Sequence, residues 1–282
     1  MKTIKLNETI EIPALGFGVF QIPQEQTKDA VVNAIQAGYR HIDTAQSYMN
    51  ETEVGEGIKA SGIDRSELFV TTKVWIENVN YEDTLKSIER SLERLQLDYI
   101  DLVLIHQPYN DVYGSWKALE ELQENGEIKV IGVSNFGVDR VVDLGIHNKV
   151  QPQVNQIETN PFHQQEDEVQ SLQKEGVLVE AWAPFAEEKN NLFSNETLQN
   201  IGDKYGKSIA QVVLRWLVER DIVVLAKSVN PERMKQNLDI FDFELTDEDK
   251  AQIATLDSND SQFFSHADPE MIKALTSRRL DV

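Results

Sequence analysis

The sequence predicts an α/β protein folded as a single (β/α)8 TIM barrel, with a short β-hairpin at its N-terminus and residues 1–282 in one domain. The length of 282 residues is suited to one α/β barrel. Short β-branched segments alternate with longer segments of helical period, a pattern typical of parallel βαβ units. No Pro/Gly-rich linker, low-complexity tract or long charge run divides the chain. Eight such units indicate a closed barrel.

The predicted strands are short apolar segments rich in Val, Ile and Leu. Most have the length of roughly four to seven residues that is expected of strands. In chain order, we predict strands at residues 15–17, 41–43, 69–73, 100–106, 130–134, 154–158, 178–182 and 222–226. Residues 1–12 precede the first of them and are expected to form the small hairpin at one end of the barrel.

Amphipathic helices are predicted between the strands. After Tyr81, the residues Leu85, Ile88, Leu92 and Leu95 fall on one helical face, while charged residues occupy the others. This spacing predicts a helix that packs one side against the barrel.

Two helix starts carry a capping signal. Ser208 is followed three residues later by Gln211, which predicts a capping box, and Asn50 followed by Glu53 is a variant of the same pattern. We therefore expect both helices to begin with a side chain bonded to the backbone.

Polar or large aromatic residues stand at the end of nearly every predicted strand, or one step beyond it. They are Asp43, Lys73, His106, Ser134, Asn135, Gln156, Trp182 and Lys227. Buried parallel strands are normally apolar throughout, and barrel enzymes place their chemistry at the carboxyl ends of the strands. The alternative is that strands simply end where polar loops begin. The repetition over so many strands favours a functional opening.

Composition excludes several classes of function. The chain has 48 acidic residues against 27 Lys and Arg, a formal net charge of −21, and no cysteine. The negative charge disfavours nucleic acid and anionic membranes as partners. The lack of cysteine rules out disulfides, Cys-ligated metals and thiol nucleophiles. No signal peptide or apolar span is visible, so we expect a cytoplasmic protein.

Three of the strand-end residues, together with Tyr48 in the loop after Asp43, suit proton transfer to a carbonyl compound. A phenol is a poor acid at neutral pH, but a neighbouring cation favours the phenolate. Lys73, held by Asp43, would therefore lower the pKa of Tyr48 and make it a general acid. A neutral His106 could orient the carbonyl oxygen. Such a site lacks only a hydride donor, which a nicotinamide supplies.

A cofactor site is predicted near the C-terminus. Asn230 suits a helix N-cap and Pro231 the first helical position. Such a helix is expected to point free N–H groups at an anion. Lys227 and Arg233 add cations in an acidic chain, as a phosphate-bearing cofactor requires. The alternative is a solvated helix with ordinary surface charges.

The chain resembles the aldo-keto reductases in several motifs that occur in order. They are GYRHIDTA at 38–45 with Tyr48, LDYIDL at 97–102, GVSNF at 132–136, NQ at 155–156 and KS at 227–228 with Arg233 and Asn237. The short C-terminal stretch around residues 265–269 resembles the small prokaryotic branch that includes the 2,5-diketo-D-gluconic acid reductases.

This resemblance implies NADPH-dependent reduction of aldehydes and ketones without a metal. It makes Asp43, Tyr48, Lys73 and His106 the catalytic set, with Tyr48 as proton donor. The implied cofactor-binding residues are Ser134, Asn135, Gln156, Trp182, Lys227, Ser228, Arg233, Gln236 and Asn237. Phe20 and Trp75, with His106, would line the substrate pocket.

Other functions stay open at this point. The barrel could bind the cofactor with little turnover, or it could be a metal-dependent hydrolase in which His41 and Asp43 begin a ligand cluster. We expect a small carbonyl compound as the substrate, NADPH/NADP+ as the cofactor, and a monomer or weak homodimer. The natural substrate, the direction of the reaction in the cell and the use of NADH are not identified by the sequence.

Overall fold

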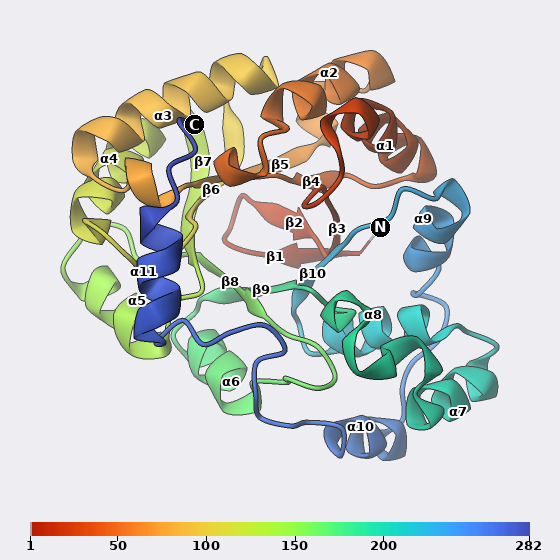
Figure 1. The fold of residues 1–282 in the computed structure, drawn as a ribbon. Helices are drawn as coiled ribbons and strands as arrows, with labels where there is room; N and C mark the ends of the chain where they lie inside the picture. Colours follow the sequence, from red (N-terminus) through yellow and green to blue (C-terminus); the bar gives the residue numbers. More distant parts are fainter. Residues whose placement is uncertain (1) are drawn as a thin grey trace.

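A computed structural model describes residues 2–282 and shows a closed barrel of eight parallel strands surrounded by helices (Figure 1). Around the barrel the strand order is β10-β3-β4-β5-β6-β7-β8-β9, so each strand lies beside its neighbours in sequence and the last pairs with the first. The strands are β3 (Leu15–Gly18), β4 (His41–Asp43), β5 (Phe69–Val74), β6 (Ile100–Ile105), β7 (Ile128–Ser134), β8 (Val154–Glu158), β9 (Leu178–Trp182) and β10 (Val223–Ala226). The predicted fold class is confirmed.

Eleven α-helices are found in the described part of the chain. They are α1 (Gln24–Ala37), α2 (Glu51–Ser61), α3 (Tyr81–Leu95), α4 (Val112–Glu124), α5 (Val138–Ile146), α6 (Glu166–Lys174), α7 (Glu196–Tyr205), α8 (Ile209–Glu219), α9 (Pro231–Leu238), α10 (Asp247–Ala254) and α11 (Pro269–Ser277). Short 3-10 turns occur at η1 (Gln46–Tyr48), η2 (Arg65–Glu67) and η3 (Ile76–Asn78). The segment η4 (Ala186–Ser194) is irregular, because its residues 187–191 have non-helical backbone angles. Apolar faces such as that of Ile88 and Leu95 in α3 are fully buried against the strands.

The N-terminal hairpin closes the end of the barrel at which the strands begin. Its strands β1 (Thr3–Lys5) and β2 (Glu11–Pro13) pair antiparallel. Ile12 is buried in an apolar cluster with residues near the starts of the strands, including Phe69, Val154 and Val223. In Figure 1 the hairpin crosses the centre of the ring of strands. The opposite end of the barrel is therefore the one that is free to carry a site.

One of the two capping predictions is correct. Ser208 and Gln211 form a reciprocal capping box at the start of α8. Asn50 precedes α2, but its side chain makes no capping bond there. Its amide nitrogen instead donates to the carbonyl oxygen of Val19 at 3.1 Å, and its oxygen accepts from the hydroxyl of Thr44 at 3.0 Å. The buried amide of Asn50 is used to join loops at the carboxyl ends of β3 and β4, so the capping prediction was wrong.

The C-terminal segment, residues 258–282, packs over the carboxyl ends of the strands. The indole nitrogen of Trp75 donates to the carbonyl oxygen of Arg278 at 3.2 Å, and the Tyr109 hydroxyl donates to that of His266 at 2.8 Å. The ring of Phe263 lies 5.1 Å from that of Trp182. The segment therefore forms part of the rim around this end of the barrel. Among residues 2–282, no helix has the length and apolar character needed to cross a bilayer.

Candidate active site

The closed barrel brings the four predicted catalytic residues to one end. Asp43 is the last residue of β4, Lys73 lies one residue before the end of β5, and His106 follows β6 directly. Tyr48 ends the turn η1, which follows β4. Because all strands are parallel, their carboxyl ends share one rim.

Lys73 is the centre of this cluster. Its ammonium group donates to both carboxylate oxygens of Asp43, at 2.6 and 2.8 Å, and to the carbonyl oxygen of Thr44 at 2.9 Å. The same nitrogen lies 3.2 Å from the hydroxyl oxygen of Tyr48. Lys73 is fully buried and Asp43 is nearly so. The carboxylate therefore fixes the cation beside the phenol, as the sequence predicts.

The electrostatics of Tyr48 differ from the sequence-based expectation. Burial lowers the pKa of Lys73, but the negative charge of Asp43 and its hydrogen bonds outweigh this, and the pKa of Lys73 is raised. Burial also raises the pKa of Tyr48, and this effect is larger than the opposing effect of the Lys73 charge. The prediction of a phenol with a lowered pKa was wrong for this structure, because it left out the loss of water around the hydroxyl group.

His106 is a neutral imidazole beside the phenol. Burial, followed by the positive charge of Lys73, lowers the pKa of His106 well below its usual value. Its Nδ1 lies 3.3 Å from the Ser47 hydroxyl oxygen, and its ring centre lies 5.8 Å from that of Tyr48. An uncharged ring in this place can donate a hydrogen bond to a substrate oxygen without competing for the proton of Tyr48.

Four predicted cofactor residues form a hydrogen-bonded group on the adjoining strands β7, β8 and β9. The Ser134 hydroxyl donates to the backbone oxygen of Gln156 at 2.8 Å. The Asn135 amide donates to the backbone oxygen of His106 at 3.1 Å, and its side-chain oxygen accepts from the indole nitrogen of Trp182 at 2.9 Å. The structure thus brings Ser134, Asn135, Gln156 and Trp182 together at the rim.

The predicted phosphate-binding residues lie at the start of α9, after β10. Lys227 and Arg233 are exposed, and within residues 2–282 neither forms an ion pair. Asn230 and Pro231 are the N-cap and first residue of α9, as predicted. The side-chain oxygen of Asn230 accepts from the backbone nitrogens of Glu232 and Arg233. The expectation of free N–H groups at this helix start was therefore wrong. An anion bound there would contact the side chains of Lys227 and Arg233 instead.

The remaining predicted cofactor residues differ in their exposure to solvent. Ser228 is partly exposed, and its hydroxyl oxygen accepts from the backbone nitrogen of Asn230 at 3.1 Å. Gln236 is exposed on α9. Asn237 is nearly buried and bonds the hydroxyl of Tyr39. Ser228 and Gln236 are accessible at this end of the barrel, whereas Asn237 has an internal partner.

Two aromatic residues predicted to line the substrate pocket flank the catalytic cluster. The ring of Phe20 lies 4.9 Å from that of Tyr48, and the ring of Trp75 lies 5.5 Å from that of His106. Phe20 is 47% exposed, whereas Trp75 is 3% exposed. Phe20 therefore lies at the entrance, with Trp75 deeper in the site.

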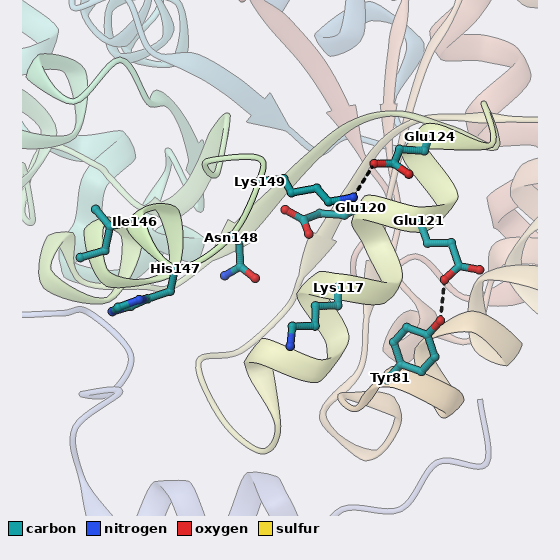
Figure 2. Close-up of a pocket in the computed structure, with 9 residues that line it drawn as sticks. All are labelled: Tyr81, Lys117, Glu120, Glu121, Glu124, Ile146, His147, Asn148 and Lys149. Atoms are coloured by element: carbon teal, nitrogen blue, oxygen red, sulfur yellow. Dashed lines mark hydrogen bonds and ion pairs between the residues drawn. The ribbon is translucent and has the colours of Figure 1, made fainter.

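A concave surface lies away from this cluster. An open pocket of about 720 Å³ is lined by residues of α4 and of the segment after α5, together with Tyr81 (Figure 2). Several of its polar side chains are paired with one another, for example Lys149 with Glu124 at 3.0 Å. None of the predicted site residues lines it. In the described chain, no three His, Asp or Glu side chains are grouped as ligands for a metal ion.

The sequence analysis missed a buried carboxyl group below the catalytic cluster. Glu180 lies in the middle of β9, two residues before Trp182, and is fully buried. The visible signal was a charged residue inside a predicted buried strand. Its partners could not be inferred, because they come from strands on other parts of the barrel. His266 and Phe263 in the C-terminal segment were missed for the same reason.

Known proteins resemble this chain over most of its length. The model of the Aldo/keto reductase family matches residues 14–258. Glyoxal reductase of Bacillus subtilis is 45% identical over 92% of this chain and 94% of its own length. Morphine 6-dehydrogenase of Pseudomonas putida is 42% identical over 90% of this chain and 91% of its own.

Solved structures match over nearly the whole chain. An aldo-keto reductase of Bombyx mori, solved in complex with NADP, is 35% identical with a TM-score of 0.90, covering 96% of each chain. A putative 2,5-diketo-D-gluconic acid reductase B is 36% identical with a TM-score of 0.87, covering 92% of this chain and 93% of that one. The resemblance seen in the sequence is confirmed: this chain belongs to the Aldo/keto reductase family.

Proposed function

We propose that the protein reduces aldehydes and ketones to alcohols, with NADPH as the hydride donor and Tyr48 as the general acid. One observation carries this proposal most directly. The Lys73 ammonium group joins the Asp43 carboxylate to the Tyr48 hydroxyl, with Lys73 Nζ 3.2 Å from the phenol oxygen. Family membership and the relative crystallised with NADP support the same reaction class.

Tyr48 holds the proton that the product needs. Burial raises its pKa, so the hydroxyl group stays protonated at neutral pH until negative charge develops on the substrate oxygen. When the proton leaves, the phenolate lies beside the ammonium group of Lys73, which stabilises it. Lys73 thus assists at the moment of transfer, without ionising the phenol beforehand.

His106 orients the substrate oxygen. In the tautomer whose Nδ1 accepts from the Ser47 hydroxyl, the neutral ring carries its proton on Nε2 and can donate a hydrogen bond to a carbonyl oxygen. Both His106 and Tyr48 then direct donors at one atom, which is where negative charge grows during reduction. The aromatic rings of Phe20 and Trp75 border this position.

The residues present fit a nicotinamide dinucleotide. NADPH supplies a hydride when it is bound. Gln156 uses its amide hydrogens inside the barrel, which leaves its side-chain oxygen to accept from a carboxamide. Ser134 and Asn135 are expected to contact the same carboxamide, and Trp182 to face the ring.

The other end of the cofactor is expected to lie on α9. Lys227 and Arg233 are unpaired cations in a chain of net charge −21, and they suit a 2′-phosphate. Ser228 and Gln236 add exposed polar groups beside them. Asn237, nearly buried, would contribute to the adenine end.

The substrate class that we propose is small reactive aldehydes and dicarbonyl compounds. The named activity of the 45% identical relative, glyoxal reduction, supports this class. The half-exposed Phe20 at the entrance presents an apolar surface of limited size rather than charged groups that would select a large polar ligand.

A spectrophotometric assay tests the proposal. NADPH consumption is followed with methylglyoxal and with an aromatic aldehyde, with and without a chelator, and the alcohol product is quantified. We expect one alcohol per NADPH and no effect of the chelator. Binding of NADPH without consumption by any aldehyde would indicate a binding protein, and loss of activity with chelator would indicate metal dependence. Either result would contradict the proposal.

A further inference from the structure

A second carboxylic acid lies inside the barrel below the proposed catalytic cluster. Glu180 points inward from β9 and is fully buried. Its Oε2 accepts a hydrogen bond from the side-chain nitrogen of Gln156 at 2.6 Å. Its Oε1 lies 3.6 Å from His41 Nε2 and has no hydrogen-bond donor among the described residues. A buried oxygen without a donor is costly for a carboxylate, which favours a protonated group.

Gln156 connects Glu180 to the catalytic cluster. Its side-chain nitrogen donates both to Glu180 Oε2 and to Asp43 Oδ2, the latter at 3.0 Å. Asp43 in turn accepts two hydrogen bonds from Lys73, whose nitrogen lies beside the Tyr48 hydroxyl. A continuous chain of hydrogen bonds therefore runs from Glu180 to the phenol.

We propose that Glu180 is a positioning residue whose protonation state controls the reaction: as a neutral acid it fixes the Gln156 amide, and as a carboxylate it weakens Tyr48 as an acid. This inference rests on the proposed function, because it assigns Glu180 a role in the same site. Glu180 acts through Gln156 and Asp43 and does not itself touch the reacting atoms.

The charges around Glu180 support a single titration in the neutral to alkaline range. Burial, followed by the negative charge of Asp43, raises the pKa of Glu180 to about 8. On β4, burial and the charge of Lys73 lower the pKa of His41 to about 3, so His41 is neutral. Burial also raises the pKa of Asp43, against the opposing charge and hydrogen bonds of Lys73 on β5.

The other facing groups do not titrate in this range. Gln156 of β8 and Val223 of β10, the register neighbours of Glu180, carry no charge. The pKa of Tyr48 is raised above its usual value, and that of His106 is lowered well below it. Of the two buried carboxyl groups, Asp43 keeps two hydrogen bonds from Lys73, whereas Glu180 Oε1 has no donor, so Glu180 is the one that holds the proton at neutral pH and loses it as the pH rises.

The physical effect of ionisation has a definite direction. A carboxylate at Glu180 adds a second negative charge next to Asp43, so two carboxylates then compete for the ammonium group of Lys73. Less of the positive charge remains to stabilise the phenolate of Tyr48, and the pKa of Tyr48 rises further. Reduction is expected to slow as Glu180 loses its proton.

The test compares the wild type with Glu180→Gln, which has the shape of the protonated acid and no charge. With NADPH and methylglyoxal, we expect kcat of the wild type to fall by about tenfold between about pH 7 and 9.5, as expected when one neighbouring charge shifts a pKa by about one unit. Glu180→Gln stays uncharged at every pH, so its kcat should change less than about twofold over this range.

A second variant tests the role of the hydrogen bond. Glu180→Met has a similar length but cannot accept from Gln156, so we expect a raised KM for NADPH at every pH. A KM for NADPH that is normal in Glu180→Gln but raised in Glu180→Met would show that the hydrogen-bond acceptor at residue 180 is required. Glu51→Gln is the control, because Glu51 is also buried but bonds Thr72 at 2.6 Å on the outer side of β5. It should keep the wild-type pH profile.

Stability provides a readout that does not depend on activity. A carboxyl group whose pKa is raised in the folded state binds its proton more tightly there, so the wild type should lose stability as pH rises from about 4.5 to 8. Glu180→Gln lacks this loss, and its melting temperature should exceed that of the wild type above about pH 8.

The outcomes separate the two proposals. If the wild type reduces no aldehyde, the proposed function fails, while the stability comparison still reports whether Glu180 titrates in the folded protein. If the wild type is active but Glu180→Gln keeps the same alkaline decline, or if its stability has the same pH dependence as that of the wild type, the role of Glu180 is overturned.

Discussion

Lys73 donates to both carboxylate oxygens of Asp43, at 2.6 and 2.8 Å, in an interior where neither side chain is appreciably exposed. Two charges placed there lose their hydration, and only their mutual attraction and hydrogen bonds compensate for the loss. The pair therefore costs little while it is intact and much when one partner is removed. The ion pair holds a cation at a fixed place next to Tyr48.

The first prediction concerns the stability of this pair. Lys73→Met should lower the free energy of unfolding by about 3–5 kcal/mol, because it leaves the Asp43 carboxylate buried without a compensating positive charge. The double variant Lys73→Met/Asp43→Asn should be more stable than the single one, since no charge is then buried. Urea unfolding at neutral pH measures the free energy of unfolding of the double variant and of each single variant. A double variant that shows the sum of the two single losses would contradict this view of the pair.

The second prediction concerns selection of the cofactor. Arg233→Ala should weaken NADPH binding by about 1.5–3 kcal/mol, the contribution of hydrogen bonds to a charged group. NADH binding should hardly change, because NADH lacks the 2′-phosphate. Lys235→Ala is the control on the same helix, since Lys235 pairs with Glu232 at 3.2 Å. Fluorescence titration with both cofactors is the measurement, and equal losses for the two would place Arg233 elsewhere.

The third prediction is a pH dependence of stability away from the site. Asp249 completes a capping box with Thr246 and accepts bonds from Lys204 and Tyr205. Burial raises its pKa, but these hydrogen bonds outweigh burial and lower the pKa to about 2. The stabilisation is complete above the unfolded pKa of about 3.8 and is lost as the pH falls through about 2.

Asp249→Asn should therefore lower the melting temperature at neutral pH, and the difference from the wild type should shrink from about pH 4 to 2. Calorimetry over this pH range measures the difference in melting temperature. Asp247→Asn, which changes an exposed residue of the same helix turn, is the matched control. A difference that stays constant down to the lowest pH would show that the charge of Asp249 is not what stabilises the helix.

The sequence predicted the barrel and the position of the catalytic set because both depend on local patterns. Asp43, Lys73 and His106 each lie within one residue of the end of a short strand, and in a parallel barrel such positions must meet at one rim. The cap at Ser208 was likewise predictable, because its partner lies only three residues away.

Features that depend on distant contacts were not predictable. The hydrogen bond between Gln156 and Glu180 depends on the register of two strands, and that between Trp75 and Arg278 on the path of the C-terminal segment. The raised pKa of Tyr48 depends on burial, which only the packed structure defines. At Asn50, the side chain bonds Val19 and Thr44 from other loops, partners that the local sequence pattern did not indicate.

The central claim is that the Tyr48 hydroxyl group delivers the proton, and Tyr48→Phe tests it most directly. The substitution keeps the ring but removes the proton, and Tyr113→Phe, on the outer surface of α4, is the control. We predict that Tyr48→Phe lowers kcat for methylglyoxal by about 10²- to 10⁴-fold, with NADPH affinity unchanged. A Tyr48→Phe variant whose kcat stays within a few-fold of the wild type would show that another group supplies the proton and would contradict the account.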